Sequence, residues 1–170
     1  LIRDSRVSIE RDFATDLPKV NAVPGQLHQV FVNVITNACN AADERGGIIR
    51  LRTGLVGHDQ IRIDVEDQGV GIAPSDLDRV FEPFFSTRRR GQGTGLGLSI
   101  VKSIGGHHGG SIEICSRARE GTTVTVALPS AELTARGGEM RPAAGDKPVL
   151  GRRPDAVPGQ GTGRCDRAQP

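Results

Sequence analysis

The 170-residue sequence has no Trp, no Tyr and only five Phe, and its net charge is +2. Nucleic acids are commonly held by a basic surface with aromatic side chains for stacking, and this composition supplies neither. The apolar runs are only a few residues long, far below the ~20 residues that cross a bilayer. We therefore expect a segment that binds no nucleic acid and makes no direct membrane contact.

Cysteine is scarce as well. Cys39, Cys115 and Cys165 are far apart in the sequence and show no metal-ligand spacing. We expect Cys39 and Cys115 to be small buried thiols in a reducing, cytoplasmic compartment. The chain begins at Leu1 rather than Met, which suggests a fragment of a longer protein whose preceding part could hold a membrane anchor.

The composition divides the chain into two parts. Over residues 131–170 the sequence holds seven Gly and five Pro but few large aliphatic residues, too little apolar surface to offset the entropy of ordering. We expect one domain over residues 1–130 and a flexible tail over 131–170. A frame-shifted or artificial terminus would also explain the abrupt change.

Hydrophobic periodicity predicts a mixed fold. Strands are expected at 7–10, 49–55, 61–65, 112–114 and 124–128, and helices at 26–43, at 75–81 with Ser75 as its cap, and at 96–104. A long Gly- and Arg-rich connection runs from 81 to 97, and connections of that length are usually functional or disordered. The order of elements predicts an α/β fold with helices layered on one face of a mixed sheet.

The first predicted helix carries a polar stripe in addition to its apolar one. Gln29, Asn33 and Asn37 follow one another at four-residue steps, with Asn40 close by. Asn weakens a helix interior, and paired neutral carbonyl oxygens suit a Mg²⁺ whose other ligands are water and phosphate oxygens. A solvated polar face explains the same stripe, so the helix alone does not decide between the two interpretations.

Two glycine motifs follow. In Asp67-Gln68-Gly69-Val70-Gly71, a carboxylate at a strand end can accept a hydrogen bond from an exocyclic amine while glycine lets a flat base approach. In Gly93-Thr94-Gly95-Leu96-Gly97, glycines expose backbone N–H groups at the start of a helix, where an anion is favoured. The second motif matches neither the P-loop nor the dinucleotide fingerprint.

Taken in order, these motifs, with Phe81-Glu82-Pro83-Phe84-Phe85 and Gly121-Thr122, closely resemble the ATP-binding catalytic domain of sensor histidine kinases. That family shares a superfamily with gyrase-type, Hsp90-type and MutL-type ATPases. The resemblance covers about residues 5–130 and implies a two-layer α/β sandwich of the Bergerat type. It also implies ATP and Mg²⁺ as ligands.

The resemblance implies a role for each matching position. Asn33 and Asn37 would bind Mg²⁺, Asp67 would read adenine, and Gly69, Gly71 and Thr122 would lie around the base. Phe81 belongs to the motif of the mobile ATP lid, and Gly93, Thr94, Gly95, Leu96 and Gly97 form the loop beside the phosphates. Arg88 would reach phosphate, although a solvated lid charge is an equal alternative.

Phosphoryl transfer would go to a histidine of a separate dimerisation domain and then to a response regulator receiver domain. None of His28, His58, His107 and His108 has the sequence context of that acceptor, and His107-His108-Gly109 resembles a structural turn of the family. Hydrolysing relatives have a Glu at the position of Asn33, which argues against a water-directed ATPase. The alternatives are an ATPase or serine kinase of the same superfamily and a non-catalytic nucleotide-binding module.

Overall fold

The computed structural model describes residues 7–42, 47–57, 59–87 and 93–132. Their elements are β1 (Val7–Phe13), α1 (Pro24–Ala42), β2 (Gly47–Val56), β3 (Gln60–Asp67), α2 (Pro74–Leu77), α3 (Gly97–His107), β4 (Ser111–Arg117) and β5 (Gly121–Pro129). Each strand and each long helix predicted from periodicity is present. Within these ranges, no helix is long and apolar enough to span a bilayer.

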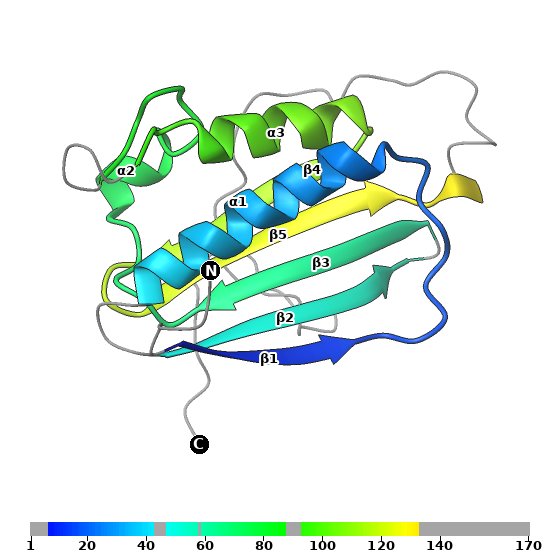
Figure 1. Cartoon of the computed structure of the whole chain (residues 1–170), viewed down its shortest axis with the longest axis horizontal. Coiled ribbons are helices and arrows are strands. Elements are labelled where there is room, and N and C mark those ends of the chain that lie inside the picture. The colour runs from blue at the N-terminus through cyan, green and yellow to red at the C-terminus, as the bar shows by residue number, and fades with distance from the viewer. Residues whose placement is uncertain (1–6, 43–46, 58, 88–92, 133–170) are drawn as a thin grey trace, which may run out of the picture.

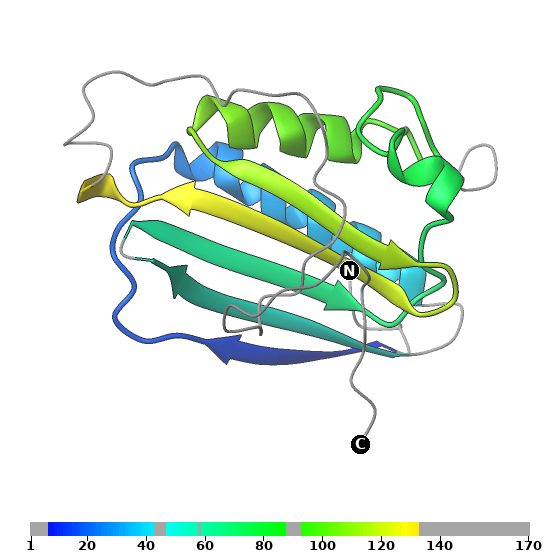
Figure 2. The same cartoon turned by 180° about the vertical axis from the view of Figure 1, so that it is seen from behind.

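The strands form one sheet in the order β1-β2-β3-β5-β4. The pair β1–β2 is parallel and the other three pairs are antiparallel, so the sheet is mixed. Helices α1 and α3 lie side by side over one face of this sheet (Figure 1), and the view from behind shows the sheet in front of them (Figure 2). This arrangement confirms the predicted two-layer α/β sandwich.

The core lies between the two layers. Helix α1 buries every fourth residue, namely Val30, Val34, Ala38 and Ala42. This spacing places one apolar stripe against the sheet. The sheet contributes Ile49, Val65, Val124 and Val126, and α3 contributes Val101 and Ile104. Complete burial of such a side chain stabilises the fold by about 1.5–3 kcal/mol, so this shared core holds both helices in place.

The face of the sheet away from α1 and α3 is polar. Arg50 contacts Glu10 at 2.8 Å, and Arg52 contacts Glu66 at 3.2 Å across the strands. Such partly exposed ion pairs add little stability. The alternation explains why Cys115 is half-buried rather than buried as expected, because its neighbour Ile114 takes the core side of β4.

Two further expectations are corrected. Ser75 does not cap α2: the helix begins at Pro74, after Ala73, and no side chain in the described part of the chain caps it. Proline is suited to the first helical position because it lacks the N–H that would need a partner there. Cys39 is also half-buried, at the margin of the core, because it lies on the flank of the buried stripe of α1. Residues 133–170 lie outside the described residues.

Candidate functional site

A row of three polar side chains crosses the sheet at the end where β3 stops. Asp67 is paired with Thr122 of β5, and Thr122 is paired in turn with Ser116 of β4. Asp67 and Thr122 are buried, with exposed fractions of 6% and 9%. The register of the antiparallel pairs, rather than nearness in sequence, brings these three residues together.

The carboxylate of Asp67 is held in one orientation. It accepts the backbone N–H of Gly69 at 2.8 Å and also the backbone N–H of Thr122. Burial raises the pKa of Asp67 to about 6, because the charged form loses hydration, and nearby Glu66 adds to this rise. The two N–H groups oppose the rise. At neutral pH the group is therefore an ionised hydrogen-bond acceptor that is costly to keep buried.

The loop after Asp67 is clamped between α1 and the β4–β5 turn. The N–H of Val70 donates to the carbonyl of Ala41 at 3.3 Å, and the N–H of Arg119 donates to the carbonyl of Val70 at 2.6 Å. A Cβ on Gly69 would lie 2.3 Å from the carbonyl oxygen of Ala41. A Cβ on Gly71, where φ is +66°, would lie 1.9 Å from that of Arg117. Both glycines are therefore required by close backbone contact.

The polar stripe of α1 separates into two parts. Gln29 and Asn40 are exposed, whereas Asn33 and Asn37 are half-buried beside the start of α3. A Cβ on Gly97 would lie 3.5 Å from Asn37 Nδ2 and 3.8 Å from Asn33 Oδ1. Asn33 Nδ2 is buried, and none of the described residues gives it a hydrogen-bond partner. The two amides thus meet α3 at its first residue.

This pair fits a divalent cation with few protein ligands. The oxygen and nitrogen of an amide have nearly the same shape, so a half-turn of the Asn33 side chain places a carbonyl oxygen in the orphaned position. Mg²⁺ is usually held by one or two protein oxygens, with water and phosphate completing the octahedron. No group of three His, Cys, Asp or Glu residues that could hold a metal occurs within the described ranges.

The glycine loop packs against the Phe motif. Phe84 has φ of +66°, and its N–H donates to the carbonyl of Gly95 at 2.9 Å. Gly95 also has φ of +66°, and a Cβ there would lie 2.5 Å from the carbonyl carbon of Phe84. The described residues give α3 no side-chain cap at Leu96, so its first N–H groups are available to an anion.

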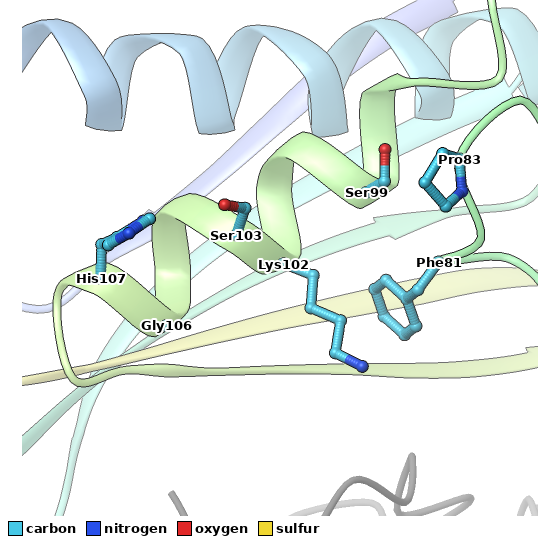
Figure 3. Close-up of a pocket in the computed structure, with 7 residues that line it drawn as sticks. All are labelled: Phe81, Pro83, Ser99, Lys102, Ser103, Gly106 and His107. Carbon is cyan, nitrogen blue, oxygen red and sulfur yellow. The ribbon is translucent and has the colours of Figure 1, made fainter. Parts of the chain in front are cut away.

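The other residues predicted for the loop and the lid differ in position. Gly93 and Thr94 are exposed just before α3, and Thr94 Oγ1 lies 3.4 Å from the N–H of Leu96. Arg88 lies outside the described residues, so its role stays a prediction. Phe81 lies in a shallow groove of about 640 Å³ on the outer side of α3 (Figure 3), with Lys102 Nζ 5.6 Å from its ring centroid. The contact between Phe81 and the nucleotide also stays a prediction.

Sequence reasoning did not single out Ser116 or Ala41. Ser116 is the second-last residue of an ordinary alternating strand, and Ala41 is a small residue near the end of α1. The hairpin predicted from the sequence had no register, and the structure is what pairs Ser116 with Thr122. His108 has the expected structural role, because its Nε2 accepts the N–H of Val23 at 3.1 Å while Nδ1 donates to the carbonyl of Ile104 at 2.8 Å.

The fold and this site define a class of ATP-binding domain. The family model of histidine kinase-, DNA gyrase B- and HSP90-like ATPases matches residues 22–132, and the chain belongs to this family. Within the family, its similarity is to sensor histidine kinases. The chain is 38% identical over 157 residues to the sensor kinase CckA of Brucella abortus (strain 2308), an alignment that covers 84% of this chain and 16% of that protein.

Solved structures agree with this assignment. The catalytic domain of histidine kinase ThkA, in a nucleotide-free form, aligns with a TM-score of 0.66 and 29% identity, covering 76% of this chain and 84% of that one. Full-length ShkA in complex with AMPPNP aligns with a TM-score of 0.65 and 29% identity, covering 74% of this chain and 26% of that one. The chain therefore corresponds to the catalytic domain and spans a minor part of the full-length proteins it matches.

Proposed function

We propose that this chain binds ATP with Mg²⁺ and donates the γ-phosphoryl group to a histidine of a separate dimerisation domain, in the cytoplasm. The observation that carries the proposal is the meeting of Asn33, Asn37 and the start of α3. Asn33 Nδ2 is buried without a partner among the described residues, and the same side chain lies beside the start of α3, whose first N–H groups have no side-chain cap there. A phosphate-bound cation would satisfy both.

Asp67 would recognise the base. Its carboxylate is buried, ionised at neutral pH and oriented by two backbone N–H groups. An exocyclic amine is the complementary donor, and a carbonyl at the same position of the base would face a negative charge. Gly69 and Gly71 would line the base site through their backbone, because the carbonyls of Ala41 and Arg117 fill the space that a side chain at either position would need.

The phosphates would lie at the other end of the site. The first N–H groups of α3 and its dipole favour an anion, and the carbonyl oxygens of Asn33 and Asn37 would hold Mg²⁺ against it. When bound, this cation neutralises charge that develops on the transferred phosphoryl group. Asn33 and Asn37 would also orient the triphosphate toward the acceptor.

The choice of transfer over hydrolysis depends on Asn33. An amide cannot remove a proton from water, and Asn33 occupies the position at which hydrolysing relatives carry a Glu. Positioning and charge neutralisation suffice for phosphoryl transfer to a histidine nucleophile. A response regulator receiver domain would then take the phosphoryl group. The complex of the similar protein ShkA with AMPPNP supports nucleotide binding by this domain.

A calorimetric titration tests the proposed site. ATP should bind the 170-residue chain with micromolar affinity in the presence of Mg²⁺, and EDTA should weaken binding at least tenfold. Asp67→Asn should abolish binding because an amide presents an N–H where the amine needs an acceptor. Asn37→Ala should remove the Mg²⁺ dependence by deleting one carbonyl ligand, without destabilising α1, since Ala is the better helix former.

Two matched variants serve as controls. Asp64→Asn changes the same residue type on the same strand, where Asp64 accepts hydrogen bonds from Arg62 and Thr125 on the polar face. Asn40→Ala changes an exposed Asn one turn along α1. Both should bind ATP as the wild type does. A folded wild-type chain that binds no ATP would contradict the proposal and favour a non-catalytic docking module.

A further inference from the structure

Ser116 forms a junction of hydrogen bonds behind the proposed base site. Its Oγ donates to the carbonyl of Gly121 at 2.9 Å and accepts the N–H of Ile72 at 2.9 Å. The same atom lies 2.9 Å from Thr122 Oγ1. One half-buried hydroxyl thus links the loop after Asp67 to both strands of the β4–β5 hairpin.

The number of hydroxyl protons in this junction decides whether Thr122 can donate a hydrogen bond to a ligand. A hydroxyl has one proton and two lone pairs. Because the proton of Ser116 goes to Gly121, the bond between the two hydroxyls needs the proton of Thr122. Both lone pairs of Ser116 are then used, one by Ile72 and one by Thr122. Thr122 keeps only lone pairs for any ligand and becomes a pure acceptor.

Thr122 is also next to the carboxylate of Asp67. The two residues are directly paired across β3 and β5, and the N–H of Thr122 donates to that carboxylate. The candidate site therefore presents two neighbouring acceptors, the carboxylate of Asp67 and Thr122 Oγ1. This pattern complements an amine with two N–H groups, and it opposes a ring carbonyl.

We infer that Ser116 is a positioning residue that sets base specificity, by consuming the proton of Thr122 and holding the Gly69–Ile72 loop in register with it. The inference rests on the proposed function, since it concerns the same nucleotide site. Ser116 itself does not touch the base. It acts through Thr122 and through Ile72, whose N–H it accepts.

ATP and ITP distinguish this role from simple structural support. Inosine differs from adenosine only at the edge in question, with a carbonyl at C6 and an N–H at N1. In Ser116→Ala, the proton of Thr122 is released and can be donated to that carbonyl. The ratio of ATP affinity to ITP affinity should therefore fall about tenfold, the factor of roughly one hydrogen bond.

The controls separate the possible causes. Loosening of the loop alone would weaken ATP and ITP equally and leave their ratio unchanged, which would overturn the inference. Ser111→Ala, at the exposed far end of β4, should change neither affinity. Ser116→Thr keeps the hydroxyl and should restore the wild-type ratio. In a Thr122→Val background, adding Ser116→Ala should not change the ratio further, and an additional change would contradict action through Thr122.

A second measurement needs no nucleotide. In the ligand-free chain, Ser116→Ala should speed hydrogen exchange of the Ile72 amide, while Ser111→Ala should not. If the wild type binds neither ATP nor ITP, the proposed function and the specificity role both fail. Exchange at Ile72 then still shows whether the link exists, and unchanged protection would overturn it. If Ser116→Ala does not fold, Ser116→Cys replaces it with the same expectations, because a thiol is a weak donor and acceptor.

Discussion

At the scale of a single residue, burial makes Asp67 both useful and costly. Its pKa lies at about 6 in the folded chain, against an ordinary value of 3.8. The native state therefore binds a proton more tightly than the unfolded chain does between these values. By linkage, the free energy of unfolding falls as pH rises from about 4 to about 6, by about 3 kcal/mol in all, and is then level.

This dependence can be isolated by substitution. Urea unfolding of the wild type and of Asp67→Asn should be measured between pH 4 and 8. The free energy of unfolding of the wild type minus that of the variant should fall by about 2.5 kcal/mol as pH rises from 4 to 7, because the rest of the change lies below pH 4. Asp64→Asn retains Asp67 and should therefore keep the part of the pH dependence of stability that Asp67 contributes. A difference between wild type and Asp67→Asn that stays constant with pH would contradict the raised pKa.

At the scale of an element, two of the three glycines of α3, Gly97 and Gly106, have different surroundings. A Cβ at Gly106 would have none of the described residues within 4 Å, whereas a Cβ at Gly97 would meet both Asn37 and Asn33 at ordinary contact distance. Both Gly97→Ala and Gly106→Ala should fold, and each should gain up to about 1 kcal/mol of helix stability. Only the methyl group of Gly97→Ala occupies space between the helix start and the two amides.

The two variants therefore form a matched pair. We expect Gly97→Ala to weaken Mg²⁺-ATP binding about tenfold, the factor expected for one displaced contact, and Gly106→Ala to leave it unchanged. Calorimetric titration measures the affinities, and thermal unfolding checks that both chains fold. Equal affinities in the two variants would place the phosphates elsewhere than at the start of α3.

At the scale of the whole molecule, the proposed reaction needs a second domain. The four His of this sequence lack the context of a phosphoacceptor, and His108 is engaged by Val23 and Ile104 in the fold. The chain alone should bind ATP, hydrolyse it slowly and remain unlabelled by [γ-³²P]ATP. Addition of a dimerisation domain that carries the acceptor histidine should produce an acid-labile, alkali-stable phosphate on that domain.

The stability of the phosphate distinguishes the alternatives. An acid-stable product on Ser would favour a serine kinase of the same superfamily. Rapid release of inorganic phosphate by the chain alone would favour a water-directed ATPase, despite the amide at Asn33. Asp67→Asn should abolish labelling in every case, since the nucleotide would no longer bind, and Asp64→Asn should not.

Much of the fold was predictable from local pattern. The alternation in β2, β3, β4 and β5 and the four-residue steps of α1 are determined by which side chains can face a common core. The start of α2 was not predicted correctly, because Pro74 competes with Ser75 for the role of start signal and only the backbone shows which one acts.

The candidate site was predictable only in part. Asp67, Gly69, Gly71 and the Asn pair are recognisable because their chemistry and spacing lie within short stretches of sequence. The pKa of Asp67 depends on burial by elements far along the chain, so no local pattern reports it. Which residues of the polar stripe of α1 are half-buried likewise depends on where α3 packs against α1.

Short-range order therefore follows from residue type and period: which segments are strands, which face of α1 is apolar, and which motifs carry carboxylate, amide or glycine chemistry. Asp67, Thr122 and Ser116 lie side by side instead because of the register of the β3–β5 and β4–β5 pairs. Register is set by the packing of the whole sheet against its helices, and shifting it by one residue would turn each of these side chains to the opposite face.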